Sequence, residues 1–370
     1  MATFNFADVK QNYDPSAPQV RFRAQGLEAA FLDPAAQLPK VPAWPADGVP
    51  QPITLNSLPD EMDDLSRFRG YDAVVVTWTA AEGAALASLM TPNNPTTSWF
   101  EYRHDIASYI PLVTGGVAPF NSKQEEMSRY FHSLGIYFPV QIGKMKVLLF
   151  KCGLHLAYDG PATPVKKLMT EIATTVKPRI FITTGTGGGV GKDVLLSDVV
   201  VGRTVRFDCS GQFKNEPWCN KEFTATTPAA DAFAAATPEL LTFNSARVPN
   251  SRRVPRIWQA ATDTILTTDV FAFDESTNHF KLEGKGQMCE MGDAMVAYAL
   301  QGIEELEWYA IRNASDPQIP NPNNNLREAE NQAGQIYAKY GGLTTASSVI
   351  ASWSLIYTAG KKNGVHGVRA

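Results

Sequence analysis

Runs of apolar residues alternate with segments of helical periodicity over most of the chain beyond its proline-rich beginning. The β-branched run at 73–76 predicts a buried strand, and alanine and leucine then recur at helical spacing from Ala80 to Met90. A second apolar run, at 146–150, precedes an amphipathic pattern over Pro164–Val176 that begins with proline. Each of these two units therefore predicts a strand followed by a helix.

Further apolar runs continue the alternation towards the C-terminus. The last, at 344–358, is apolar almost all round and predicts a buried helix. Strands that alternate with helices of this length predict an α/β sheet covered by helices on both faces, with ligands at the carboxyl ends of the strands. The other predicted strands are 179–182, 198–207, 263–271 and 307–312, and the other predicted helix is 293–303.

Composition changes along the chain and suggests its organisation. Residues 1–65 hold nine of the 25 prolines, and only 24–32 looks helical in this stretch. Because proline disfavours helices and central strands, we expect 1–65 to form an arm that packs on the main domain or on a partner subunit. Residues 66–370 are expected to form one catalytic domain, with weakly periodic insertions at about 91–143 and 209–262.

Charge and cysteine content exclude several classes of protein. A net charge of −4 gives no basic field, so neither nucleic acid nor an anionic membrane is an expected partner. No run of 18 apolar residues and no signal-like N-terminus is visible, so the cytoplasm is the expected location. The four cysteines lack zinc-site or disulfide-framework spacing, so neither a metal nor another cofactor is expected.

The segment 183–193, TTGTGGGVGKD, looks like a glycine loop after a strand. A phosphate-binding P-loop would need glycine at Thr186 and a hydroxyl residue at Asp193, and a dinucleotide fingerprint would need glycine at Val190. Both are excluded. Two interpretations remain: a backbone whose N–H groups approach a ligand or a neighbouring chain closely, or a tight strand-to-loop turn.

Chemically reactive residues follow four of the predicted strands. The segments are VVVTWTAAEGAAL with Glu82, ITTGTGGGVG, QMCEMGDAMVAYAL with Glu290 and Asp293, and WYAIRNASDP with Arg312 and Asp316. In this order and spacing the set resembles the nucleoside phosphorylase superfamily, and within it the methylthioadenosine/S-adenosylhomocysteine nucleosidases and related purine nucleosidases. The resemblance runs from about Tyr71 to the C-terminal helix, interrupted by the two insertions.

The resemblance implies a three-layer αβα sandwich with a central mixed β-sheet that cleaves the N-glycosidic bond of a purine nucleoside. Glu82 corresponds to the glutamate that activates the attacking water, and a closed pocket is expected to raise its proton affinity. Asp316 corresponds to the aspartate that protonates or hydrogen-bonds the purine N7. The alternatives are a solvated glutamate at a helix start and a turn aspartate before proline.

The same resemblance implies roles for the surrounding residues. Phe271 matches an aromatic ring that stacks on the purine, although a phenylalanine among valines is as often core. Met291 matches a methionine packed against the ribose. Glu290 and Arg312 are expected to form a buried ion pair beneath the site. The residues Thr186, Gly187 and Ser315 complete the expected substrate-binding set.

One position departs from the pattern of the family. The methionine is usually followed by a glutamate that accepts hydrogen bonds from the ribose hydroxyls, and here that position is Gly292, with Asp293 directly after it. Asp293 could reach the sugar through a shifted backbone, or the sugar could be held differently. Loss of that contact would cost on the order of 2 to 3 kcal/mol, which is enough to change substrate choice.

The choice between water and phosphate as the nucleophile rests on cationic side chains. Phosphorylases of the superfamily supply arginines from two loops, and the corresponding segments here, TWTAAEG and KCGLHLAYDG, contain none. His155 is a poor substitute, whereas Arg103 and His104 could fold over the pocket from the first insertion. Hydrolysis is therefore predicted, and the alternatives are a phosphorylase and an inactive nucleoside-binding domain. By analogy with the superfamily, the protein is expected to form a homodimer or a higher oligomer.

Overall fold

One mixed β-sheet runs through the molecule in the computed structural model, which describes residues 6–16, 38–115, 120 and 131–366. Its strand order is β1-β4-β5-β2-β6-β12-β11-β8-β9, with β3 on β4, β13 beside β6, and β7 joining β13 to β10. The strands are β1 (Gln51–Pro52), β2 (Ala73–Thr77), β3 (Phe100–Tyr102), β4 (Gly135–Ile142), β5 (Met145–Cys152), β6 (Ile180–Gly189), β7 (Val199–Gly202), β8 (Thr204–Phe207), β9 (Glu222–Thr224), β10 (Ile257–Trp258), β11 (Thr264–Thr267), β12 (Met288–Glu290) and β13 (Glu307–Asp316).

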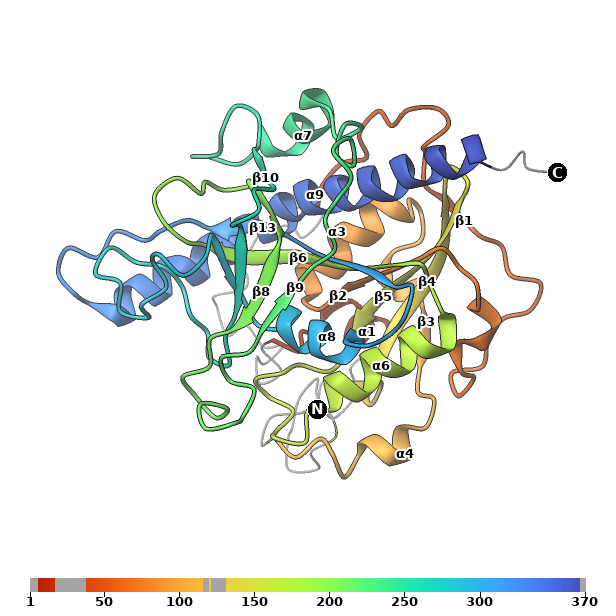
Figure 1. Cartoon of the computed structure of the whole chain (residues 1–370), viewed down its shortest axis with the longest axis horizontal. Helices are drawn as coiled ribbons and strands as arrows, with labels where there is room; N and C mark the ends of the chain where they lie inside the picture. Colours follow the sequence, from red (N-terminus) through yellow and green to blue (C-terminus); the bar gives the residue numbers. More distant parts are fainter. Residues whose placement is uncertain (1–5, 17–37, 116–119, 121–130, 367–370) are drawn as a thin grey trace.

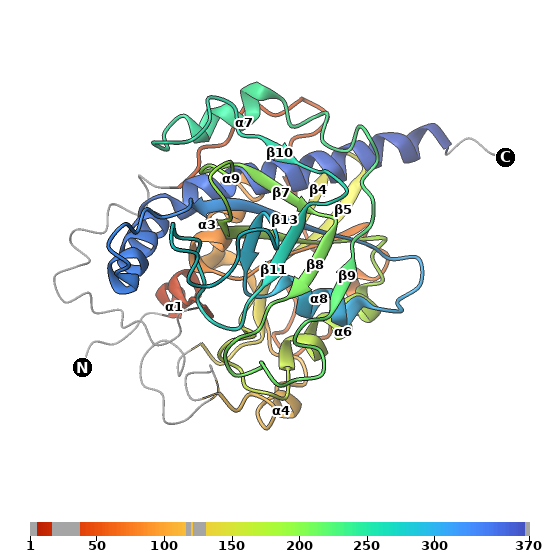
Figure 2. The same cartoon turned by 60° about the vertical axis from the view of Figure 1, so that its left-hand side comes forward.

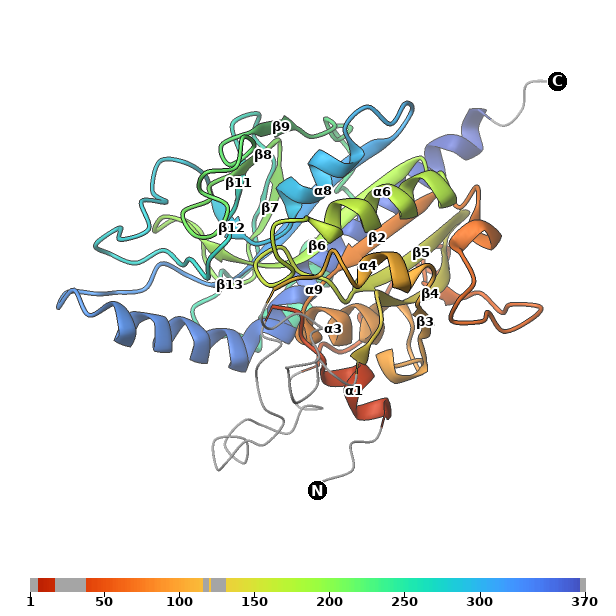
Figure 3. The same ribbon diagram turned by 90° about the horizontal axis from the view of Figure 1, so that it is seen from below.

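Helices cover both faces of this sheet. Figure 1 shows α7 and α9 above it and α6 and α8 below it, and Figure 3 shows α6 and α8 side by side on their face, where they are in contact. The α-helices are α1 (Phe6–Asn12), α3 (Ala80–Met90), α4 (Ile106–Tyr109), α6 (Pro164–Val176), α7 (Pro238–Ser245), α8 (Asp293–Leu300) and α9 (Leu326–His366), and the short 3-10 helices are η1 (Leu65–Phe68) and η2 (Thr96–Ser98).

The alternation of side chains along each strand creates the two cores. In β2, Val74 and Val76 join the cluster that includes α6 and α8, whereas Ala73 and Val75 join the cluster that includes α3, α7 and α9. Successive side chains of a strand point to opposite faces, so a strand that is apolar at every position is buried between two helical layers. The predicted three-layer α/β sandwich with a mixed sheet is therefore confirmed.

Several predicted elements are confirmed with their boundaries, and others are longer or divided. The helices Ala80–Met90 and Pro164–Val176 have the predicted bounds, and the buried helix at 344–358 is the inner part of the 41-residue α9. The strand predicted at 198–207 is divided between β7 and β8, because these pair with different neighbours, β7 with β13 and β8 with β11. Within the segment 91–143, β4 pairs along its whole length with β5.

The loop predicted at 183–193 is wrong for its first seven residues, which continue strand β6 to Gly189. Strand β13 pairs with β6 in parallel over nearly its full length, and β2 and then β12 occupy its other edge. Glycine has a low strand propensity, yet pairing on both edges satisfies the backbone and outweighs that preference.

The N-terminal segment packs against the main body. Helix α1 contacts α3 (Figure 2), Tyr13 stacks on Phe131 with ring centroids 4.0 Å apart, and Asp14 accepts a hydrogen bond from the backbone N–H of Ala80 at the start of α3. This α1 helix was not predicted. The helix predicted at 24–32 lies outside the described residues.

Candidate active site

A cavity of about 500 Å³ opens where the carboxyl ends of β2, β12 and β13 meet the glycine segment of β6. This is the location that the strand–helix alternation predicted. The predicted site residues that line the cavity are Glu82, Thr186, Gly187, Phe271, Glu290, Met291, Arg312, Ser315 and Asp316. Asp293 does not line it: its side chain is buried beneath the wall and binds Arg312.

Glu82 is fixed by both local and tertiary structure. It is the third residue of α3 and completes a capping box with Thr79. Its Oε2 accepts hydrogen bonds from the hydroxyl of Thr77 and from the backbone N–H groups of Trp78 and Thr79, at 2.8 to 2.9 Å. Its Oε1 accepts from the backbone N–H and the hydroxyl of Thr186, at 2.6 and 2.7 Å. These five donors join β2, α3 and β6 at one carboxylate.

The expectation that the pocket raises the proton affinity of Glu82 is wrong. Burial alone would raise its pKa, but Arg312 and the hydrogen bonds from Thr186 and Thr79 outweigh burial, so the pKa is lowered. Glu82 is therefore an ionised carboxylate at neutral pH.

Arg312 is surrounded by three carboxylates. Its guanidinium donates two hydrogen bonds to Asp293, of which that from Nε is 2.9 Å long. Its nitrogens also lie 3.4 Å from Oε2 of Glu290 and 3.6 Å from Oε1 of Glu82. The predicted Glu290–Arg312 pair is thus present, with Asp293 as the closer partner. Burial and the neighbouring Asp293 raise the pKa of Glu290 to about 8, so this group readily holds a proton. The carboxylates of Glu82 and Asp293 around one cation favour a positive charge that develops in the cavity.

Asp316 has a different environment from that of Glu82. Its Oδ1 accepts a hydrogen bond of 3.0 Å from the hydroxyl of Ser315. No donor among the described residues bonds to its Oδ2. Burial raises the pKa of Asp316 to about 6, so the carboxyl group holds a proton more readily than an exposed aspartate does.

Two of the four glycines of β6, Gly185 and Gly188, are explained by these two carboxyl groups. A Cβ atom at Gly185, where φ is +143°, would lie 2.4 Å from the carboxylate carbon of Glu82, and a Cβ atom at Gly188 would lie 2.9 Å from Oδ2 of Asp316. A strand rises about 3.3 Å per residue, so these two positions are about 10 Å apart along β6. A tight turn is not observed at these two positions, where the backbone continues strand β6 against the carboxyl groups of this chain.

Several further residues that line the cavity were not predicted as site residues, among them Trp78, Ser16, Glu330 and Tyr337. Trp78 follows β2, Ser16 follows α1, and Glu330 and Tyr337 come from the first half of α9. Trp78 directly follows a predicted strand, so its position was a usable signal. For the others the sequence offers none, because α1 and the outer half of α9 meet the sheet only through tertiary packing.

The candidate anion-binding residues either lie away from the cavity or carry no charge at neutral pH. His155 lines the cavity, but burial lowers its pKa to about 4, so its ring is neutral at pH 7. Arg103 pairs with Glu61 and Glu101, and His104 lies 3.9 Å from Glu171. Neither lines the cavity. Among the described residues around the cavity, Arg312 is the one permanent cation, and carboxylates already surround it.

Metal-binding groups and membrane-spanning helices are both absent from the described part of the chain. No group of three or more histidine, cysteine, aspartate or glutamate side chains is placed there to hold a metal ion. No helix in that part is long and apolar enough to cross a membrane.

Known proteins are similar to this chain to different degrees. No curated protein matches the sequence. Similar solved structures include the 5'-methylthioadenosine/S-adenosylhomocysteine nucleosidase of Neisseria meningitidis, at 14% identity and a TM-score of 0.45, covering 78% of this chain and 99% of that one. The futalosine hydrolase of Helicobacter pylori is similar at 12% identity and a TM-score of 0.44, covering 77% and 97%. The family model described as the phosphorylase superfamily matches residues 111–340. The chain therefore belongs to the phosphorylase superfamily.

Proposed function

We propose that the protein is a purine nucleoside N-ribosidase, in which water cleaves the N-glycosidic bond. The observation that carries this proposal is the pairing of two unlike carboxyl groups in one cavity: Glu82, whose pKa is lowered, and Asp316, whose pKa is raised to about 6. Groups whose pKa values are driven apart by their surroundings suit a base and an acid in one reaction.

In this reaction Asp316 gives its proton to the purine as the bond between C1' and the ring nitrogen breaks. The electron pair of that bond leaves with the base, and the sugar becomes cationic, as in other glycosyl transfers. The carboxylates of Glu82 and Asp293, against one guanidinium, stabilise that cation. Water then bonds to C1'.

Glu82 orients this water and accepts its proton once the sugar carries positive charge. A weak base is sufficient at that stage, because bonding to a cationic carbon acidifies the water. Five donors already bond to Glu82, so the water displaces a threonine hydroxyl, from Thr77 or Thr186, which can rotate whereas the backbone N–H groups cannot.

Hydrolysis is favoured over phosphorolysis by the charges around the cavity. An incoming phosphate needs unpaired cationic donors. The described residues around the cavity supply one arginine that carboxylates surround and one histidine that is neutral at pH 7.

The test incubates the protein with adenosine, inosine or methylthioadenosine, in the presence and absence of phosphate, and measures the released base by chromatography. We expect release that does not depend on phosphate, and a loss of at least about 100-fold in kcat/KM for Glu82→Gln. The surface variant Glu222→Gln is the matched control and should retain full activity. Release that requires phosphate, or nucleoside binding without turnover, would contradict the proposal.

A further inference from the structure

Met291, Gly292 and Trp78 line the cavity that also holds Glu82 and Asp316, and none of these three side chains carries an oxygen or nitrogen acceptor for a sugar hydroxyl. We call these three residues the apolar wall of the cavity. If water is held at Glu82 and the purine at Asp316, the sugar lies between them and contacts this wall. The chemistry of the wall therefore decides which groups of the sugar are recognised.

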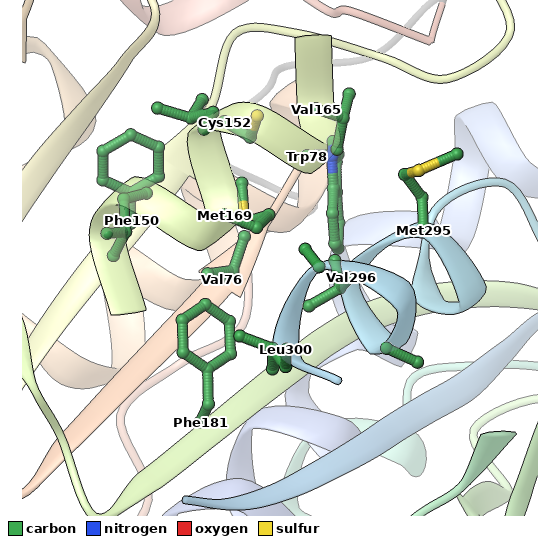
Figure 4. Close-up of a cluster of buried hydrophobic side chains, with 14 of the residues drawn as sticks. Val76, Trp78, Phe150, Cys152, Val165, Met169, Phe181, Met295, Val296 and Leu300 are labelled. Carbon is green, nitrogen blue, oxygen red and sulfur yellow. The ribbon is translucent and has the colours of Figure 1, made fainter. Parts of the chain in front are cut away.

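Trp78 fills the space that a side chain at position 292 would need. A Cβ atom at Gly292 would lie 3.2 to 3.5 Å from three atoms of the indole ring. The ring belongs to the same buried cluster as Val165, Met295 and Val296, as Figure 4 shows, and it is 4% exposed. The guanidinium of Arg312 also lies 4.9 Å from the centre of the ring. A side chain at position 292 would therefore press on an indole that the buried cluster and Arg312 hold in place.

The neighbouring carboxylates are already occupied by protein donors. Glu290 accepts hydrogen bonds from the hydroxyl of Thr267 and from the backbone N–H groups of Gly292 and Asp293. Asp293 accepts hydrogen bonds from Nε and Nη2 of Arg312, and Nη2 also lies 3.4 Å from Oε2 of Glu290. Neither carboxylate has the free oxygen pair that two adjacent sugar hydroxyls would require.

We propose that the cavity takes 2'-deoxyribonucleosides in preference to ribonucleosides, an inference that rests on the proposed function. A 2'-hydroxyl withdraws electrons and destabilises a cationic sugar. Glycosidases offset this with hydrogen bonds to that hydroxyl, which strengthen in the transition state and contribute several kcal/mol. A site that lacks the contact gains nothing from the hydroxyl and still bears its electronic cost. The reaction consumes one water and yields the free purine and 2-deoxyribose.

The test compares kcat/KM for 2'-deoxyadenosine with adenosine, and for 2'-deoxyinosine with inosine, on the full-length protein. We expect the deoxyribonucleoside to be favoured at least about 10-fold in each pair. A preference for the ribonucleosides of 10-fold or more would overturn the inference and leave the hydrolase proposal intact. If no base were released from any of the four nucleosides, the proposal of a hydrolase would be overturned. The affinities of the protein for the two nucleosides of each pair, measured by calorimetry, would then decide the sugar preference.

A pair of variants tests the cause. In Trp78→Ala/Gly292→Glu the indole is removed and a carboxylate is introduced, so the ratio of deoxyribo to ribo activity should fall by about 10- to 100-fold. Trp78→Ala alone is the matched control and should keep the wild-type preference, since it adds no acceptor. An unchanged ratio in a folded double variant would contradict the role assigned to this wall.

Discussion

The substitution Asp316→Asn is expected to move activity and stability in opposite directions. Asparagine preserves the shape of the side chain and the acceptor that Ser315 bonds, but it removes the charge and the transferable proton. Asp316 is 6% exposed, and burial raises its pKa from 3.8 to about 6. A shift of this size corresponds to roughly 3 kcal/mol of unfavourable free energy when the carboxylate is ionised in the folded protein.

The sign of this contribution follows from the raised pKa. Below pH 3.8 the group is protonated in both the folded and unfolded states, so burial costs nothing. As pH rises through about 6, the unfolded state releases the proton first, and the folded state is destabilised by the full amount. The Asn variant should therefore be more stable than wild type by up to about 3 kcal/mol at pH 8, with the difference vanishing near pH 4.

Urea unfolding followed by tryptophan fluorescence from pH 4 to 8 measures this difference, with base release assayed on the same samples. The variant should lose at least about 100-fold in kcat/KM. The control is Asp263→Asn, at an aspartate that is buried outside the cavity, which should keep wild-type activity. A variant that is less stable than wild type at pH 8, or equally stabilised at pH 4 and pH 8, would refute the assignment of Asp316 as a buried acid.

Two further predictions concern the same carboxyl groups. The proposed reaction requires Asp316, with a pKa of about 6, to be protonated and Glu82, with a lowered pKa, to be ionised. In a profile from pH 4 to 9, kcat/KM should therefore fall about tenfold per pH unit above pH 6. A rise in kcat/KM from pH 6 to 8 would exclude this pair of roles. Gly185→Ala should destabilise the protein by about 2 to 6 kcal/mol in urea unfolding and lower activity sharply, through strain at φ +143° and overlap with Glu82. Gly191→Ala, at positive φ with open space around it, should cost only about 1 to 2 kcal/mol, and equal costs would contradict the close packing at Gly185.

Much of the architecture could be predicted from local patterns. The helices Ala80–Met90 and Pro164–Val176 have the predicted bounds, because their starts are marked by a capping threonine and a proline, respectively. Strand β2 was recognised because it is apolar from Ala73 to Val76, as is typical of a strand between two helical layers. These signals are contained in a few consecutive residues.

The glycine run shows where such signals are insufficient. Its local preference is for a turn, yet β13, β2 and β12 pair with it and make it a strand. Those partners come from distant parts of the chain, so no window of sequence around the glycines contains the information.

The sequence by itself determined the layered α/β fold through its alternation of strand and helix patterns, which are local properties. Its resemblance to the nucleoside phosphorylase superfamily indicated which side chains meet at the carboxyl ends of the strands, where sheet geometry brings them together. Only the tertiary structure decided how those side chains are charged. Glu82 has a lowered pKa and Asp316 a raised one, although both are buried carboxyl groups, because Arg312 and five hydrogen-bond donors reach the first and a single hydroxyl reaches the second. The balance between desolvation and hydrogen bonding depends on contacts across the whole sheet.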